Sequence, residues 1–337
     1  MTLKDIIIAG KLTISEGGGG GGEDWRKKDG KTYLHITIDQ NVFKTVNLRF
    51  GQTVASGNTI NWGDGSAAVT PTNTSSAYVS HTYSELGDYV ISIENTSGYF
   101  YFGDSSTTKG YIFQDGVNNV SNDKVRNYPL ILKKAELGKG WKADAGRQFA
   151  WCRRLTDVYV STKPDQNTLG AYMFDTCTAL REIDGADKWS SGITTLGNYV
   201  FSYCTALEKL VLPTSVTSIS DYYLQGNTTL PTTITSIVLP SGITSIGKNA
   251  FTQCKCAAII DIPATVTTIG NDAFQYPYGA HEIHVRATTP PTLGNSNVFS
   301  GFGTNVYNPK IYVPAASLST YQGADNWSGL ASYMEGE

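Results

Sequence analysis

The chain has 337 residues, with 26 lysines and arginines against 29 aspartates and glutamates, so its net charge is -3 and its isoelectric point is near 5.8. This balance lacks the basic footprint of a nucleic-acid-binding protein, and no apolar run approaches the ~20 residues of a membrane span. Charged residues are few, whereas glycine (35) and tyrosine (20) are abundant, which favours turn-rich β structure in an extracellular or virion-exposed protein.

Residues 1–30 are predicted to form an N-terminal anchor arm and a glycine-rich hinge. Residues 1–16 hold one strand-like stretch, 6–14, and the glycine run 17–22 is too flexible to pack into a core. The apolar stretch is too short for a signal peptide and follows Asp5, so export by another route, a leader outside this sequence and release by lysis stay open. An arm and a hinge before folded domains indicate tethering at the N-terminus; the alternative is a disordered tail with an artificial linker.

Residues 31–97 alternate like half-buried β-strands. They include a Trp-Gly-Asp-Gly turn at 62–65 and a His-Thr-Tyr segment at 81–83 that precedes an alternating strand. The pattern resembles the PKD domain, a small immunoglobulin-like β-sandwich, although that family usually has one more residue between the tryptophan and the glycine. The resemblance implies a spacer or a weak binding module.

The residues of this pattern are expected to have structural tasks. The glycines of the 62–65 turn supply positive φ, Trp62 fills the core, and Tyr83 anchors a corner through its hydroxyl. Asp64 and His81 are assigned to turn and strand, and a catalytic or metal-binding task for them is the weaker alternative. Residues 98–128 are predicted to be an aromatic and polar connector, partly paired with the sandwich and partly covering the first coil of the C-terminal repeats.

Phenylalanine recurs at one phase from about residue 129 onward, at intervals of 23 to 27 residues. A period of this length indicates a solenoid, in which each coil buries its face only against its neighbours. We expect the residues at this phase to form a buried aromatic column, called the spine below. The spine positions are Phe149, Phe174, Phe201, Leu224 in place of phenylalanine, Phe251, Phe274 and Phe299.

Two motifs accompany the spine, Leu-Pro-x-x-Val-Thr-x-Ile-Gly and Ala-Phe-x-x-Cys-x-x-Leu, and they are clearest at 237–254 and 260–274. They resemble the BspA-type leucine-rich repeat of gut and oral bacterial surface proteins and of some of their phages, over residues 129–315. Pro240 is expected to end a strand because proline cannot donate to a ladder. Gly247 or Gly270 is expected to permit the turn into a short helix or 3₁₀ segment that carries Ala-Phe.

Four of the five cysteines, Cys152, Cys177, Cys204 and Cys254, lie three residues after a spine position. Residues of one phase stack in a solenoid, so we expect buried free thiols that pack as small hydrophobic side chains. A zinc site or disulfides are the weaker alternative. Cys256 is outside the column, and one intervening residue disfavours an unstrained disulfide between it and Cys254.

The sequence holds no phosphate-binding loop, nucleophile elbow, His-Glu-x-x-His motif or dinucleotide fingerprint. His281 and His284 have i,i+3 spacing, but an extended segment sends them to opposite faces. We therefore predict no catalytic, cofactor-binding or metal-binding residues and no enzyme. A polysaccharide-active enzyme, the remaining class, would need two carboxylates about 5–10 Å apart in a groove.

Residues two positions before and two positions after the spine flank the buried column and are predicted to lie at the surface. Several are aromatic, and tyrosine and tryptophan give large contact area at small entropy cost, so an aromatic stripe here is a candidate ligand-binding site. Packing between coils is the equal alternative. The candidate residues are Tyr172, Tyr199, Tyr222, Trp151, Tyr203 and Tyr276.

The predicted fold is mainly β: an immunoglobulin-like β-sandwich, a leucine-rich-repeat solenoid and a C-terminal cap at 316–337. The predicted function is non-enzymatic recognition or attachment, first as a head or tail fibre of a phage virion that binds a bacterial surface glycan or protein. The alternative is a BspA-like adhesin on a bacterial surface that binds host protein or glycan. The arm would anchor the chain to the virion or the cell surface, and whether the chain forms a homotrimer stays open.

Overall fold

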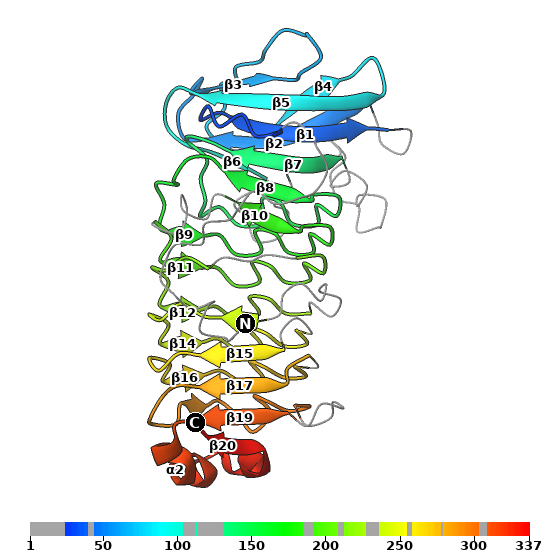
Figure 1. Ribbon diagram of the computed structural model, residues 1–337. Helices are drawn as coiled ribbons and strands as arrows, with labels where there is room; N and C mark the ends of the chain where they lie inside the picture. The colour runs from blue at the N-terminus through cyan, green and yellow to red at the C-terminus, as the bar shows by residue number, and fades with distance from the viewer. Residues whose placement is uncertain are drawn as a thin grey trace.

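The computed structural model describes residues 24–39, 44–103, 112–113, 131–184, 192–207, 212–226, 236–254, 258–277, 279–302 and 309–337. The fold is mainly β, with a β-solenoid of about seven turns, an antiparallel unit at its N-terminal end and short helices at its C-terminal end (Figure 1). The predicted arm 1–16 and hinge 17–22 lie outside the described residues.

The antiparallel unit has two sheets, with β1, β5 and β3 adjacent in one and β4, β2 and β6 adjacent in the other. Alternation along β1 buries Leu34, Ile36 and Ile38 on one face, as the sequence period predicts. β6 falls in the segment expected to be a connector, and it extends the second sheet through pairs such as Phe50 with Phe102. The strands are β1 (Thr32–Ile38), β2 (Thr45–Gln52), β3 (Asn58–Asn61), β4 (Ala77–Thr82), β5 (Gly87–Asn95) and β6 (Phe100–Phe102).

The turn at 62–65 and the corner at Tyr83 take the structural tasks expected of them. The two glycines of the turn have φ values of 82° and 83°. The Tyr83 hydroxyl donates a hydrogen bond to the Trp62 carbonyl at 2.9 Å, and both side chains are buried. His81 stacks on the Trp62 ring and lies 2.6 Å from Asp64 Oδ2, which ties the turn to β4.

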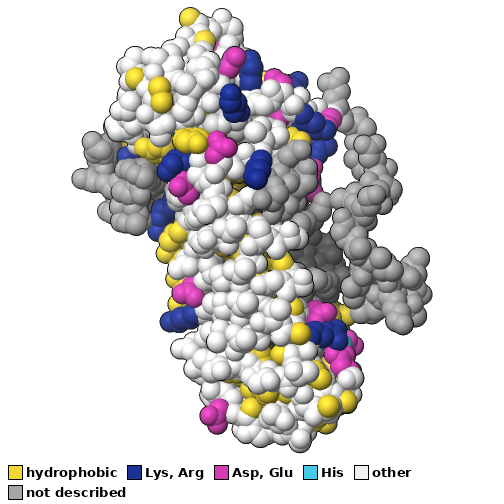
Figure 2. Space-filling model, turned by 90° about the vertical axis from the view of Figure 1, so that its left-hand side faces the viewer, with side chains coloured by type: hydrophobic (Ala, Val, Ile, Leu, Met, Phe, Trp, Pro, Cys, Tyr) yellow, Lys and Arg dark blue, Asp and Glu magenta, His cyan; other side chains and the backbone are white. Residues whose placement is uncertain are grey.

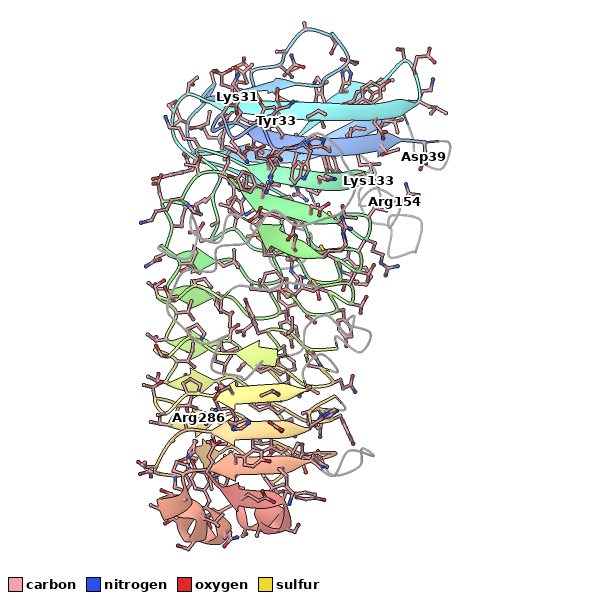
Figure 3. All side chains as sticks on the ribbon, in the orientation of Figure 1. Lys31, Tyr33, Asp39, Lys133, Arg154 and Arg286 are labelled. Atoms are coloured by element: carbon pink, nitrogen blue, oxygen red, sulfur yellow. The ribbon has the colours of Figure 1, made fainter. Side chains whose placement is uncertain are left out.

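One six-stranded sheet joins the antiparallel unit to the first coils. β1 pairs antiparallel with β7, in a register that sets Leu34 opposite Ala135, and β8 and β10 continue the sheet in parallel. The first edge of the solenoid is therefore paired, so its backbone groups cannot recruit other strands. Arg154 and Asp39, labelled in Figure 3, add a salt bridge of 2.8 Å across the same junction. These strands are β7 (Leu132–Leu137), β8 (Asp157–Val160) and β10 (Glu182–Asp184).

The segment 24–30, called the N-terminal strap, crosses the outer face of this sheet. Trp25 meets the ring of His35 on β1 edge to face, with 5.3 Å between the ring centroids. Arg26 forms a salt bridge with Asp184 on β10. The strap therefore touches both the antiparallel unit and the first coils.

A buried carboxylate on β7 fixes the strap. The Glu136 side chain is fully buried, and its two oxygens accept hydrogen bonds from the backbone N–H groups of Lys27 (2.7 Å) and Lys28 (2.8 Å). Lys28 has a φ of 57°, and such a left-handed residue turns successive N–H groups toward one anion. Since a buried carboxylate is costly unless it is hydrogen-bonded, Glu136 and the strap depend on each other.

The coils beyond this sheet repeat a longer and a shorter strand, each stacked in parallel on its equivalents (Figure 1). The longer strands stop just before Pro240, Pro263 and Pro314, which confirms the predicted strand stop. The longer strands are β13 (Ser236–Val238), β15 (Ile259–Ile262), β17 (Glu282–Val285) and β19 (Lys310–Val313). The two-residue strands are β9 (Thr168–Leu169), β11 (Thr195–Leu196), β12 (Ser218–Ile219), β14 (Ser245–Ile246), β16 (Thr268–Ile269) and β18 (Thr292–Leu293).

Figure 2 shows the side of the molecule that carries the two-residue strands. Charged side chains are sparse over the middle of the solenoid on this side and more frequent toward the antiparallel unit. The repeats thus present mostly neutral polar side chains and backbone to solvent here.

The spine is buried and stacked as predicted, with every spine side chain at most 3% exposed. Phe174 lies between Phe149 and Phe201, with 5.4 Å between ring centroids on each side and interplanar angles of 8° and 4°. At Leu224 the stack is interrupted. The preceding residue, Tyr223, meets Phe201 edge to face instead, again at 5.4 Å.

The turn that carries each spine residue differs from the expected short helix. It consists of two successive turns, closed in one coil by the N–H of Asp175 donating to the Tyr172 carbonyl (3.2 Å) and that of Cys177 donating to the Phe174 carbonyl (3.0 Å). Left-handed residues at both ends of the segment stop a right-handed helix from propagating. The prediction of a continuous helix or 3₁₀ segment is therefore wrong for these coils, although the single turns have the i→i−3 hydrogen bonds of a 3₁₀ helix.

The glycine before each turn also has a different task from the one expected. Gly247 and Gly270 are outside the left-handed region, and a Cβ on either would lie 2.6 Å from backbone atoms of the preceding coil. At Gly197 the same addition would come within 2.3 Å of the Ala171 nitrogen. Adjacent coils meet backbone to backbone here, so close approach requires the glycines and positive φ does not.

The cysteine column is only partly as predicted. Cys152, Cys177 and Cys204 are buried free thiols, and burial raises the pKa of each. The Cys177 thiol donates to the Phe149 carbonyl at 3.0 Å. Cys254 is disulfide-bonded, so the free-thiol prediction is wrong at this position. Phase accounts for its burial but carries no information on a second thiol outside the column.

Helices and one strand close the C-terminal end of the solenoid (Figure 1). Trp327 lies 5.5 Å from the Phe299 ring and 5.1 Å from Tyr321, measured between centroids, so the aromatic column continues beyond the last coil. At the other end Phe102 meets Phe149 at 5.7 Å. The elements are η3 (Ala315–Ser317), α2 (Leu318–Gly323), η4 (Ser328–Tyr333) and β20 (Met334–Gly336), which pairs in parallel with β19.

Candidate functional site: the left-handed edge

The spine turns form one edge of the solenoid, where two columns of residues have left-handed φ. We call it the left-handed edge. Residues two positions before the first six spine positions have φ between 53° and 61°, and those two positions after all seven have φ between 54° and 81°. The first left-handed column is Arg147, Tyr172, Tyr199, Tyr222, Asn249 and Asp272. The second is Trp151, Thr176, Tyr203, Gly226, Gln253, Tyr276 and Gly301.

Hydrogen bonds between coils hold this backbone. The N–H of Tyr199 donates to the Asp221 carbonyl at 3.1 Å, that of Tyr203 donates to the Gln225 carbonyl at 2.8 Å, and Phe201 between them donates in the same direction. A left-handed residue other than glycine costs roughly 1–2 kcal/mol, and each hydrogen bond contributes roughly 1 kcal/mol. Repetition of the ladder from coil to coil offsets the strain, so the side chains of both columns stand on a rigid support.

Three of the predicted site residues are brought into one stack. Tyr199 lies between Tyr172 and Tyr222, with centroid distances of 4.5 Å and 4.4 Å and interplanar angles of 5° and 4°. We call these residues the tyrosine stack. Burial raises the pKa of the Tyr199 hydroxyl to about 12, and its neighbours Tyr222 and Tyr172 add to the rise. The stack covers both faces of the middle ring, so it offers ring edges and hydroxyls to a partner.

Cations cover the two ends of the tyrosine stack. The Arg147 guanidinium carbon lies 3.8 Å from the centroid of the Tyr172 ring, and Lys248 Nζ lies 5.9 Å from that of Tyr222. A cation over a ring face is attracted by the ring quadrupole, and arginine occupies this position more often than lysine does. The faces that the stack leaves at its ends are therefore occupied by side chains of the protein itself.

Tyr203 and Tyr276 are arranged differently. Their side chains are 45% and 38% exposed, and each lies over the backbone of a glycine one coil further on. The glycine is Gly226 beneath Tyr203 and Gly301 beneath Tyr276. These two residues, called the tyrosine platforms, are three coils apart and do not belong to the stack. The aromatic stripe expected from the sequence thus splits into two structures.

A half-buried carboxyl lies between the two columns. Burial raises the pKa of Asp175 to about 6, and the positive charge of Arg147 opposes that rise. The hydroxyls of Thr176 and Ser202 act in the same direction as the arginine. The charged form of the carboxyl loses hydration in this half-buried position, which raises the pKa.

Trp151, the remaining predicted site residue, stands at the N-terminal end of the second column. It is partly buried, and the Arg153 guanidinium carbon lies 4.8 Å from its ring centroid. Trp151 therefore does not form a continuous surface with Tyr203, which lies two coils away.

In the described ranges, no cluster of three or more histidine, cysteine, aspartate or glutamate side chains is placed to hold a metal ion. No helix in those ranges is long and apolar enough to cross a membrane. The left-handed edge combines aromatic rings and neutral hydrogen-bonding groups with a few charged side chains, among them Arg147, Asp175 and Asp272.

Sequence reasoning missed four residues that shape this edge: Arg147, Lys248, Gly226 and Gly301. The two glycines carried a usable signal, because each lies two residues after a spine position and one period after a tyrosine. Arg147 carried the same kind of signal, because it shares the phase of the tyrosine stack, whereas Lys248 lies outside that phase and carried none.

A family model described as the BspA type leucine-rich repeat region matches the chain in 6 copies, over residues 77–190, 145–281 and 230–300. No curated protein matches the chain. A solved leucine-rich cell surface protein from Faecalibacterium prausnitzii A2-165 is 23% identical with a TM-score of 0.30 over 45% of this chain, and the match spans 42% of that protein's chain. The family matches together reach from residue 77 to residue 300, which is more than half of the sequence. The chain therefore belongs to the BspA-type leucine-rich repeat family.

Proposed function

We propose that the protein is a non-enzymatic recognition or attachment protein that acts outside the cell and binds a bacterial surface glycan or protein through the left-handed edge. One observation carries this proposal: aromatic side chains repeat along that edge on a backbone held by hydrogen bonds between coils. Rigid aromatic side chains lose little entropy on binding, which makes them efficient contact residues.

The setting we favour is a phage virion, where the chain serves as a head or tail fibre. An adhesin on a bacterial surface that binds host protein or glycan is the second candidate, and membership of the BspA-type family favours it. In both settings the antiparallel unit acts as a PKD-like spacer, and residues 1–30 anchor the chain. The genes that flank this one separate the settings: capsid or tail genes support the first, and export or polysaccharide-utilisation genes support the second.

A whole-cell binding assay tests the function. Fluorescently labelled protein is mixed with a panel of gut bacteria and with host epithelial cells, and bound label is measured by flow cytometry. A variant with Tyr172, Tyr199 and Tyr222 all changed to Ser is compared with Tyr78→Ala, an exposed tyrosine on β4. Binding lost with unchanged thermal unfolding supports the stack as part of the site, whereas lost folding assigns it to packing between coils. Absence of binding to every cell type would contradict the proposed function.

A further inference from the structure

We propose that the tyrosine platforms, Tyr203 and Tyr276, form a two-point site for a neutral glycan chain that lies along the solenoid axis. The inference rests on the proposed recognition function and names its ligand class. It also moves the contact from the tyrosine stack to the second left-handed column.

The first argument is the pairing of each platform with a glycine. A Cβ added to Gly226 would lie 2.3 Å from Cε1 of Tyr203, and one added to Gly301 would lie 2.6 Å from Cδ1 of Tyr276. These separations are far shorter than a van der Waals contact, so the ring occupies the space that a side chain would take. The same arrangement occurs twice in one column.

Left-handed φ alone does not account for these glycines. Thr176 and Gln253 stand in the same column with φ values of 60° and 59°, so this backbone accepts residues with a side chain. What distinguishes Gly226 and Gly301 is the tyrosine one coil earlier. The glycine lets the ring lie against the coil, and the two tyrosines stay 45% and 38% exposed in that position.

Exposure separates the platforms from the other tyrosines of the edge. Tyr203 is 45% exposed and Tyr276 is 38% exposed, whereas Tyr199 is enclosed between two rings at 4.5 Å and 4.4 Å. A sugar ring needs an accessible aromatic face on which its C–H groups can pack. The platforms are the more exposed aromatic side chains of this edge, whereas the stack offers ring edges.

The second argument is charge. At the platforms and on the two coils between them, every residue at the first and second positions after the spine is uncharged; the next coil before Tyr203 carries Asp175 at the first of these positions. We call the uncharged set the neutral strip. It consists of Ser202, Tyr203, Gln225, Gly226, Thr252, Gln253, Gln275 and Tyr276. Ser202, Gly226 and Thr252 are buried, so the three glutamines supply the accessible amides, which both donate and accept hydrogen bonds as sugar hydroxyls do.

The third argument is dimension. Three coils separate the platforms, which at the usual spacing of paired strands is about 14 Å along the axis. The neutral strip is one turn segment wide and contains eight residues, fewer than the 20–30 residues a side of a stable protein interface. A narrow, rigid, neutral strip with an aromatic face at each end fits an extended oligosaccharide better than a folded protein.

The test uses native affinity electrophoresis of the full chain in gels that contain laminarin, mannan, xylan or a soluble starch, with polygalacturonate as the charged control. At least one neutral polysaccharide is expected to retard the protein. Tyr203→Ala and Tyr276→Ala should each weaken that retardation by about tenfold, and the double variant should abolish it. Tyr78→Ala, with a tyrosine of similar exposure at 40% on β4, should leave it unchanged.

Gly226→Ala is the most specific variant, because it keeps the Tyr203 side chain but its Cβ displaces the ring from its position over the glycine. It should weaken retardation about as much as Tyr203→Ala, with thermal unfolding recorded to show that each variant folds. Retardation by none of the neutral polysaccharides, retardation that the platform variants leave intact, or a preference for polygalacturonate would each overturn the inference. If cells are still bound in that case, only the glycan site fails; if neither cells nor glycans are bound, the proposed function fails as well.

Discussion

The guanidinium carbon of Arg147 lies 3.8 Å from the ring centroid of Tyr172 and closes one end of the tyrosine stack. Arg147→Ala is expected to destabilise the fold by about 1 kcal/mol, because a cation over an aromatic face at this range contributes that much. Urea unfolding followed by tyrosine fluorescence measures the change. Arg147→Lys keeps the charge without the planar group, so its stability should lie between that of the parent and that of Arg147→Ala. Equal stability of all three proteins would contradict the assigned role.

The carboxyl of Asp175 should make stability depend on pH. Burial raises its pKa to about 6 from a reference value of 3.8, so the fold favours the protonated form. The resulting destabilisation is nearly absent below pH 4, develops between pH 4 and about 6, and is complete at higher pH. Asp175→Asn should therefore stabilise the protein at pH 8 by about 1–3 kcal/mol and leave it nearly unchanged at pH 4. Urea unfolding at both pH values provides the test, with the exposed Asp165→Asn as control. An equal effect of Asp175→Asn at both pH values would show that the carboxyl is not perturbed.

Truncation of one spine residue should be costly. Phe174 stacks between two phenylalanines at 5.4 Å and is 1% exposed, so Phe174→Ala is expected to cost roughly 3–5 kcal/mol. The chain supplies its own conservative variant, since Leu224 occupies the same phase. Phe174→Leu should cost less than about 2 kcal/mol. Comparable losses for the two variants in thermal unfolding would mean that stacking, and not volume, sets the stability of the spine.

Close approach of coils predicts a sharp contrast between two glycines. Gly197→Ala would bring its Cβ within 2.3 Å of the Ala171 nitrogen, so it should cost roughly 1–3 kcal/mol. Gly242→Ala meets no atom within 4 Å and should be neutral or stabilising by up to about 1 kcal/mol. Melting temperatures of the two variants, compared with the parent, decide the matter. A tolerated Gly197→Ala would show that the coils separate easily.

Release of the strap should be visible without global unfolding. Glu136→Ala removes the acceptor of the Lys27 and Lys28 N–H groups, and hydrogen bonds to a charged group contribute roughly 1.5–3 kcal/mol each. Amide exchange at these two residues should accelerate by ~100-fold or more. Glu94→Ala removes an exposed partner of Lys31 and should not change exchange in the strap. Unaltered protection in Glu136→Ala would show that other contacts hold the segment.

Much of the solenoid could be predicted from period alone, because a repeat reports what every coil shares. Phe174 and its equivalents are buried, Pro263 follows a strand, and Cys177 packs as a small buried group, all at the expected phase. Period does not report the backbone conformation inside a coil. Tyr172 has left-handed φ although tyrosine has no preference for it, because hydrogen bonds to the next coil impose the conformation.

The phase of the repeat predicted which residues lie along the left-handed edge, but it did not predict that the aromatic residues there divide into two structures. Tyr199 and Tyr203 are four residues apart and looked alike as surface tyrosines, yet one is enclosed in a stack and the other lies over glycine. The difference depends on residues one coil away, Tyr222 in one case and Gly226 in the other. The pairing of β1 with β7 could not be predicted either, because no local sequence pattern links two strands so distant in the chain.

Because β1 and β7 share one ladder, the antiparallel unit and the solenoid cannot swivel against each other without breaking backbone hydrogen bonds. The antiparallel unit and the solenoid therefore move as one rigid body. The tyrosine platforms keep a fixed orientation relative to Glu136, where the strap is bound. Copies gathered at their N-terminal ends would present their platforms in one fixed pattern. If the platforms bind a glycan as proposed, each further contact in such an array becomes intramolecular, so several weak contacts together give strong attachment.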